Sequence, residues 1–70
     1  MILITGGLGY LGGRLSKVLI SKGFKVRITT SRTNPLIPTE LSSCEIIKID
    51  LNNISSIDKA CKGIKTIIHL

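Results

Sequence analysis

The chain opens with Met1–Gly12, which reads MILITGGLGYLG. A short apolar run, Ile2–Ile4, leads into a turn with glycines at positions 6, 7, 9 and 12, and apolar residues at helical spacing follow directly. Apolar runs without alternation are typical of parallel strands buried on both faces. The stretch therefore predicts a strand, a glycine turn and a helix whose first N–H groups favour a bound anion.

The spacing of these glycines is specific. Gly7, Gly9 and Gly12 fit G-x-G-x-x-G, which in a strand–turn–helix context is typical of dinucleotide-binding sites, and Gly6, Gly9 and Gly12 fit the related G-x-x-G-x-x-G. We expect Gly6 and Gly7 to allow a tight turn with positive φ. We expect Gly9 to let the backbone approach a pyrophosphate, and Gly12 to let the helix pack close to the strand. The alternative is a turn that is rich in glycine for structural reasons alone.

Four apolar runs rich in β-branched residues indicate strands. They are Ile2–Thr5, Lys25–Thr30, Glu45–Ile49 and Thr66–Leu70. Helical patterns separate the first run from the second and the third from the fourth, so right-handed crossovers and a parallel sheet are predicted. The expected fold is α/β, a partial Rossmann fold with strand order 3-2-1-4, the first half of a doubly wound nucleotide-binding domain.

The first helix is predicted from about Gly9 to Lys22, with Gly23 as its C-terminal cap. Apolar residues recur along it at the spacing of one helical face, which we expect to cover the sheet. These residues are Leu11, Leu15, Val18 and Leu19.

A second helix fits Ile54–Lys62, with Asn53 as its N-cap. Its inner stripe is predicted to consist of Ile54, Ile57 and Cys61. Between the second and third strands, Pro35 and Pro38 leave room for a turn or a short distorted helix but not for a long one.

Composition narrows the class of protein. The chain has 70 residues, one Phe, one Tyr and no Trp, so one small domain with an aliphatic core is expected. The net charge is +6, but the basic residues are scattered and lack interleaved aromatic residues, so we expect no nucleic-acid surface. No signal peptide or membrane span is indicated, and a cytoplasmic location is expected. Cys44 and Cys61 lack a metal or redox spacing and are interpreted as reduced structural residues.

Four segments, in order, resemble those of the extended short-chain dehydrogenase/reductases. These are NAD(P)-dependent epimerases and dehydratases, many of which act on nucleotide sugars. Residues 5–12, TGGLGYLG, resemble the signature T-G-G-x-G-[FY]-[IL]-G, and residues 23–27, GFKVR, resemble the entry to the family's second strand. Asp50-Leu51 resembles the Asp-Leu pair after the third strand, and residues 62–70, KGIKTIIHL, resemble the segment K-G-V-D-x-V-I-H-L-A. The resemblance covers the whole chain.

The resemblance implies a pyrophosphate site at the glycine turn. Gly6, Gly9 and Gly12 would cradle the pyrophosphate. Tyr10 and Leu11 would lie at the helix N-terminus, where backbone N–H groups meet a phosphate.

The resemblance also implies an adenine site after the third strand. The carboxylate of Asp50 would accept from the exocyclic amine, and the N–H of Leu51 would donate to a ring nitrogen. The alternative for Asp50 is a solvated acid at a strand end. His69 and Leu70 would line the cofactor cleft, where packing beside the cofactor is the role expected for His69.

The end of the second strand bears on the choice of cofactor. An NAD-specific site places Asp or Glu there to bind the ribose hydroxyls, but this chain has Thr30. Ser31 and Arg32 are expected to bind a 2′-phosphate, with Arg14 as a second positive charge. The sequence therefore favours NADP over NAD. The alternative is that Arg32 points to solvent and the choice of cofactor is relaxed.

The family's reaction depends on a Tyr-x-x-x-Lys pair, with the nicotinamide carrying hydride. The one tyrosine, Tyr10, lies in the glycine turn, with Arg14 four residues on. We therefore expect no catalytic residue and no metal site in residues 1–70. They are interpreted as the N-terminal part of the NAD(P)-binding domain of a longer epimerase, dehydratase or reductase, without its catalytic and substrate-binding parts. Its small-molecule substrate would be a nucleotide sugar or similar. The alternatives are a non-catalytic NAD(P)-binding sensor or structural protein, and a remnant without function.

Overall fold

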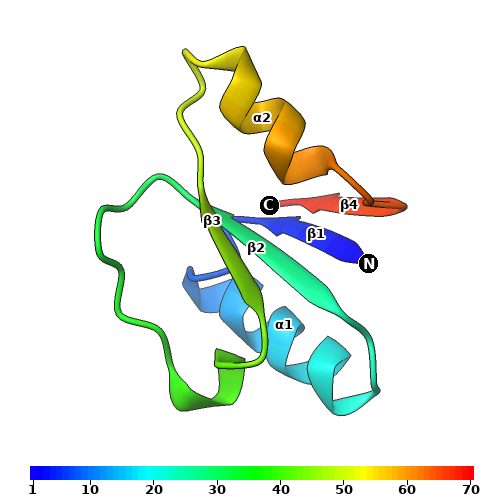
Figure 1. Ribbon diagram of the computed structural model, residues 1–70. Coiled ribbons are helices and arrows are strands. Elements are labelled where there is room, and N and C mark those ends of the chain that lie inside the picture. The colour runs from blue at the N-terminus through cyan, green and yellow to red at the C-terminus, as the bar shows by residue number, and fades with distance from the viewer.

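The computed structural model describes residues 1–70 as a parallel sheet with one helix on each face (Figure 1). The strands are β1 (Ile2–Thr5), β2 (Val26–Thr30), β3 (Glu45–Lys48) and β4 (Thr66–His69). The helices are α1 (Tyr10–Ser21) and α2 (Ile54–Cys61), and a short 3₁₀ turn, η1 (Thr39–Leu41), precedes β3. The sheet order β3-β2-β1-β4 confirms the predicted α/β class and the order 3-2-1-4. Neither helix has the length and apolar character needed to cross a bilayer.

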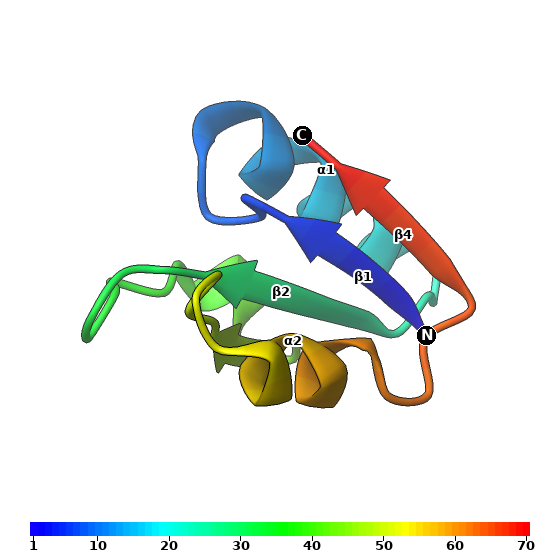
Figure 2. The same ribbon diagram turned by 90° about the horizontal axis from the view of Figure 1, so that it is seen from above.

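All strands run in the same direction, so their carboxyl ends meet at one edge of the sheet (Figure 2). Thr5 at the end of β1 lies opposite Thr29 of β2 and His69 of β4. Thr30 at the end of β2 lies opposite Lys48 of β3. This register gathers polar side chains from all four strands at that edge.

The core is aliphatic, as the composition predicts. Ile4, Val26, Ile28 and Leu41 form its fully buried cluster. Leu41 comes from η1, which follows Pro38, so the proline-containing connection does hold a short distorted helix as predicted. Complete burial of a leucine side chain contributes about 1.5–3 kcal/mol to folding. The segment between β2 and β3 is therefore packed against the core near its C-terminal end, through Leu41.

The predicted inner face of α1 is partly wrong. Leu15 and Leu19 pack against the core cluster, but the side chains of Leu11 and Val18 are 63% and 49% exposed. The buried residues of α1 are instead Gly12 and Ser16, whose hydroxyl donates to the Gly12 carbonyl at 2.7 Å. Small residues let a helix approach its neighbours closely, and a count of apolar residues alone misses such a face.

The predicted inner stripe of α2 is also wrong in part. Ile54 is 75% exposed and Cys61 is exposed, whereas Ile57 is half-buried and Ala60 is fully buried. The helix has only eight residues, and its one buried residue lies in its last turn. Apolar packing therefore holds α2 only near its C-terminal end.

The predicted N-cap of α2 is confirmed. Asn53 Oδ1 accepts from the N–H of Ser55 at 3.0 Å. We expect Asn53→Ala to lower the free energy of unfolding by about 1 kcal/mol, because this N–H then loses its partner. Urea unfolding followed by circular dichroism measures the change, and Asn53→Asp, which keeps an acceptor, serves as the control. Equal midpoints for Asn53→Ala and the wild type would contradict the cap.

Candidate functional site

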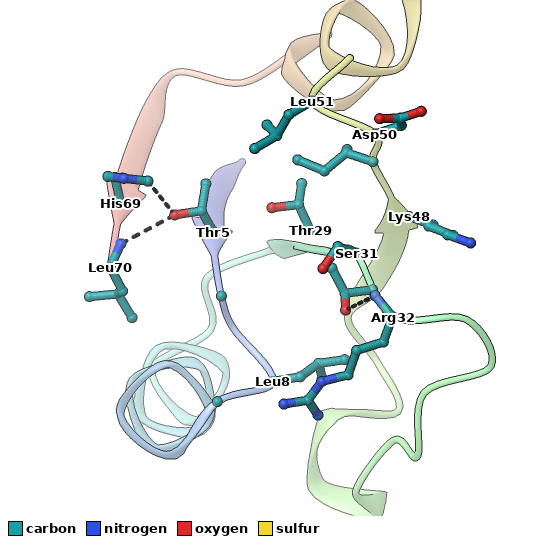
Figure 3. Close-up of a pocket in the computed structure, with 14 residues that line it drawn as sticks. Thr5, Leu8, Thr29, Ser31, Arg32, Lys48, Asp50, Leu51, His69 and Leu70 are labelled. Carbon is teal, nitrogen blue, oxygen red and sulfur yellow. Dashed lines mark hydrogen bonds between the residues drawn. The ribbon is translucent and has the colours of Figure 1, made fainter. Parts of the chain in front are cut away.

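A cleft of about 750 Å³ opens at the carboxyl edge of the sheet (Figure 3). This volume is within the range of small-molecule sites, about 300–1,000 Å³. The cleft lies where β1 has β2 on one side and β4 on the other, the switch point at which open α/β sheets bind ligands. The residues that line it are Thr5, Gly6, Leu8, Gly9, Thr29, Thr30, Ser31, Arg32, Lys48, Ile49, Asp50, Leu51, His69 and Leu70.

The glycine turn forms one wall, and its glycines serve different purposes. Gly6 has φ +67°, as predicted, and its carbonyl accepts from the N–H of Gly9 at 3.0 Å. The prediction of positive φ at Gly7 is wrong. Gly7 is instead required for space, because a Cβ there would lie 2.6 Å from Cγ2 of Ile28 in β2.

Gly12 and Gly9 also differ in how far packing within the protein requires a glycine. Gly12 does not line the cleft, and a Cβ on it would overlap the Gly6 carbonyl oxygen and lie 2.8 Å from Gly7 Cα, so the helix does pack closely as predicted. Gly9 lines the cleft in an ordinary extended conformation, φ −74° and ψ 177°. A Cβ on Gly9 would meet only the Gly6 oxygen, at 3.3 Å. Packing within the protein therefore explains Gly12 more fully than Gly9.

The first turn of α1 begins beside the cleft without a side-chain cap. Its first internal bond runs from the N–H of Gly13 to the carbonyl of Gly9 at 2.8 Å. The N–H groups of Tyr10, Leu11 and Gly12 donate to no group of the protein. Such unpaired groups, at the positive end of the helix dipole, favour an anion.

The side chains at the start of α1 turn away from the cleft. Tyr10 is 83% exposed, its hydroxyl accepts from Arg14 Nη1 at 3.3 Å, and the Arg14 guanidinium lies 5.6 Å from the ring centroid. Both residues line a smaller hollow, which shares Leu8 and Gly9 with the cleft. Arg14 therefore does not line the cleft, and its charge at the cofactor site stays a prediction. Neither Tyr10 nor Leu11 lines the cleft.

A basic corner lies where β2 and β3 end. Ser31 and Arg32 are exposed and line the cleft, and Thr30 Oγ1 accepts from the N–H of Arg32 at 3.1 Å. Lys48 lines the same corner, and its Nζ donates to Thr33 Oγ1 at 2.7 Å. Sequence reasoning missed Lys48, which comes beside Thr30 only through the strand register.

The loop after β3 forms the rim opposite the glycine turn. Asp50 Oδ1 accepts from the N–H of Asn52 at 2.9 Å, which leaves Oδ2 without a partner. Leu51 is 78% exposed, and its N–H has no acceptor in the protein. The rim therefore has one free N–H group and one free carboxylate oxygen, the latter on a side chain that Figure 3 shows turned away from the middle of the cleft.

At the ends of β1 and β4, Thr5 joins the two strands. Its Oγ1 accepts from the N–H of Leu70 at 3.2 Å and lies 2.8 Å from His69 Nδ1 (Figure 3). The Thr5 hydroxyl can donate to Nδ1 or accept from it, according to the tautomer of His69. Thr5 thus orients His69 within the cleft, a role that sequence reasoning missed.

The cleft brings together most of the predicted cofactor-binding residues. These are Gly6, Gly9, Ser31, Arg32, Asp50, Leu51 and His69. Tyr10, Leu11 and Gly12 lie outside its lining. The lining residues that the sequence did not indicate are Thr5, Leu8, Thr29, Lys48 and Ile49.

A parallel sheet with a helix on each face, and a glycine turn beside a cleft at its switch point, define an α/β protein of the Rossmann class. The chain belongs to the NAD dependent epimerase/dehydratase family, whose model matches residues 2–70. This confirms the resemblance to the extended short-chain dehydrogenase/reductases.

Known proteins similar to the chain include a synthase, a reductase and a protein solved with a nucleotide sugar. The chain is 33% identical over 73 residues to noscapine synthase from Papaver somniferum, covering 90% of the chain and 21% of that protein. It is 35% identical to MoeE5, solved in complex with UDP-glucuronic acid and NAD, with a TM-score of 0.76 over 99% of the chain and 21% of MoeE5. It is 28% identical to vestitone reductase from alfalfa (Medicago sativa), with a TM-score of 0.77 over 97% of the chain and 24% of that structure. The chain thus spans a quarter or less of the length of the curated relatives it matches.

Proposed function

We propose that this chain binds a nicotinamide adenine dinucleotide in the cleft, NADP in preference to NAD. It would serve as the dinucleotide-binding part of an epimerase, dehydratase or reductase that acts on a nucleotide sugar or a similar small molecule. Membership of the family supports the cofactor, and the similarity to MoeE5, which was solved with UDP-glucuronic acid and NAD, supports the substrate class.

The conformation and surroundings of Gly9 are the main support for a ligand at the glycine turn. Gly9 has no positive φ, and a Cβ on it would meet one atom of the protein, the Gly6 carbonyl oxygen, at 3.3 Å, which is a tight contact and not an overlap. As the N-cap of α1 it also forgoes the side-chain oxygen that stabilises most helix starts. A glycine here is explained if a ligand occupies the space where a side chain would lie, beside the free N–H groups of α1.

Each wall of the cleft would bind a different part of the dinucleotide. Gly6 and the first turn of α1 would hold the pyrophosphate through N–H groups, and Gly9, whose own N–H donates to the Gly6 carbonyl, would leave space for it. Leu51 N–H and Asp50 Oδ2 would receive adenine, since one donates and the other accepts. His69 would lie beside the ligand, oriented by Thr5. The nicotinamide of the bound cofactor would carry the hydride.

The charges of the basic corner support NADP. The lining residues at the end of β2 include no carboxylate that would repel a 2′-phosphate. Arg32 carries positive charge there and Ser31 adds a hydroxyl, whereas the ammonium of Lys48 points away from the cleft toward Thr33 (Figure 3). Guanidinium groups bind phosphate through two parallel hydrogen bonds, which makes Arg32 the principal candidate.

Titration of the ¹⁵N-labelled chain with NADPH and NADH tests the proposal. We expect saturable shifts of the amide signals of Gly9–Gly13 and Leu51, with the lower Kd for NADPH. Absence of saturable shifts with both dinucleotides would contradict dinucleotide binding, and a lower Kd for NADH would contradict the preference alone.

The substitution Arg32→Ala separates the two cofactors. We expect Kd for NADPH to rise about tenfold, because charge-assisted hydrogen bonds to the 2′-phosphate are lost, while Kd for NADH stays unchanged. Calorimetric titration of each cofactor measures both constants. Arg14→Ala removes the same charge outside the cleft and should alter neither. Equal losses for NADPH and NADH in Arg32→Ala would show that Arg32 does not bind the 2′-phosphate.

A further inference from the structure

Arg27 in β2 is the one charged residue that the fold buries. Its side chain is 11% exposed. A buried guanidinium is unfavourable unless it is paired and hydrogen-bonded. Neither the predicted nor the observed cleft residues include Arg27, so its charge needs another explanation.

The guanidinium of Arg27 joins two strands to the end of a helix. Nη1 donates to the carbonyl oxygens of Ala60 and Lys62, both at 2.7 Å. Nε lies 3.2 Å from Glu45 Oε1 as an ion pair without hydrogen-bond geometry, and Nη2 donates to Glu45 Oε2 at 3.5 Å. Arg27 therefore connects β2, β3 and the C-terminal end of α2.

These contacts are the main attachment of α2. A helix of eight residues is marginal without tertiary contacts, and only Ala60 of α2 is buried. The last carbonyl groups of a helix lack internal partners and favour a cation. Arg27 supplies both hydrogen bonds and charge to carbonyls at this end.

The other end of α2 holds the rim of the cleft. Ser56, in the first turn, accepts from the N–H of Asp50 at 3.1 Å, and its hydroxyl lies 3.0 Å from the Asp50 carbonyl oxygen. Asp50 and Leu51 both line the cleft. A continuous set of contacts thus runs from Arg27 through α2 and Ser56 to the rim.

We propose that Arg27 is a positioning residue for the adenine side of the dinucleotide site. It fixes α2, and α2 fixes the Asp50-Leu51 rim through Ser56. This inference rests on the proposed function, because it assigns Arg27 to a site that binds a dinucleotide. It predicts that loss of Arg27 impairs recognition of adenine and spares recognition of pyrophosphate at the glycine turn.

The test compares ADP with inorganic pyrophosphate on the ¹⁵N-labelled 70-residue chain. ADP carries both groups, and pyrophosphate carries only the one expected at the glycine turn. In Arg27→Met, which keeps an unbranched apolar stem and removes the guanidinium, we expect Kd for ADP to rise about tenfold, as when one or two hydrogen bonds are lost. Kd for pyrophosphate should stay within about twofold, and Leu51 should lose its ADP-induced shift.

Two further variants make the test selective. Lys25→Met removes the same charge from an exposed side chain next to β2 and should change neither Kd. Ser56→Ala leaves Arg27 intact but breaks the link to Asp50, and it should reproduce the selective loss of ADP affinity. If Arg27→Met does not fold, the same comparison of ADP and pyrophosphate affinities is made with Ser56→Ala alone.

The outcomes separate the inference from the proposed function. A wild-type chain that binds neither ADP nor pyrophosphate would contradict both. Wild-type binding of ADP that is unchanged in Arg27→Met and Ser56→Ala would overturn only the role of Arg27. Parallel losses of ADP and pyrophosphate affinity in the folded variants would also overturn it, because they indicate general destabilisation rather than positioning of the rim.

Discussion

Gly12→Ala is expected to leave much of the chain unfolded. The new Cβ would overlap the Gly6 carbonyl oxygen and lie 2.8 Å from Gly7 Cα. Both are backbone atoms of a tight turn, so no side-chain rotation relieves the overlap and α1 must move away from the sheet. Overpacking costs about 1–3 kcal/mol even where side chains can adjust. We expect a loss of about 3 kcal/mol or more, a large share of the roughly 5–15 kcal/mol of a typical domain.

Gly13→Ala is the matched control in the same turn of the same helix. The nearest atom to a Cβ at Gly13 is the Gly7 carbonyl oxygen at 3.7 Å, an ordinary contact. Alanine favours a helix over glycine by about 1 kcal/mol, so this variant should be more stable than the wild type. Urea midpoints from circular dichroism compare the variants. A Gly12→Ala midpoint at or above that of the wild type would contradict the close packing of α1 on the turn.

Gly9→Val is expected to abolish dinucleotide binding while the fold survives. The backbone of Gly9 is extended, with φ −74°, a conformation open to valine, and the new Cβ would meet the Gly6 carbonyl oxygen at 3.3 Å, a tight contact that a shift of a few tenths of an ångström relieves. Its side chain would occupy the space proposed for the pyrophosphate, beside the free N–H groups of α1. We expect Kd for NADPH and for ADP to rise more than about a hundredfold, which corresponds to about 2.7 kcal/mol. Calorimetric titration measures the loss, and circular dichroism checks the fold.

A smaller substitution provides a graded control. In Gly9→Ala the single methyl group meets the Gly6 carbonyl oxygen at 3.3 Å and fills less of the cleft. Its Kd should fall between those of the wild type and Gly9→Val. If folded Gly9→Val binds NADPH as tightly as the wild type, the pyrophosphate does not bind at Gly9.

The fold could be predicted almost entirely, because each step depends on local pattern. The β-branched runs and the glycine turn define strands and helices whose observed ends differ from the predicted ones by at most one residue. The handedness of parallel crossovers then leaves few possible strand orders. Conformational rules of this kind need no knowledge of tertiary contacts.

The helix faces could not be predicted as well, because they depend on contacts between distant segments. Val18 has the spacing of a core residue, but α1 approaches the sheet through Gly12 and Ser16 instead. Ile54 likewise lies outside the contacts of α2, whose main attachment is polar and comes from Arg27. Buried small or charged residues are invisible to a search for apolar spacing.

In the candidate site, too, the features that depend on local pattern could be predicted and those that depend on tertiary contacts could not. The motif glycines and the strand ends lead to Gly9, Asp50 and His69, since the carboxyl ends of parallel strands share one edge. Lys48 could not be found in this way, because the register of β3 against β2 decides which residue lies beside Thr30. Side-chain orientation, such as that of Arg14, is equally beyond a sequence pattern.

The central position of β1 affects the order in which the sheet can form during synthesis. Ile2 pairs with Val26 on one side and with Thr66 on the other. At the usual rate of about 5–20 residues per second, β1 exists for roughly 3–13 s before β4 has been made. During that interval one edge of β1 is unpaired and available to other strands. The strand at the centre of the sheet is thus fully paired only when β4, the last of the four strands in the sequence, has been made.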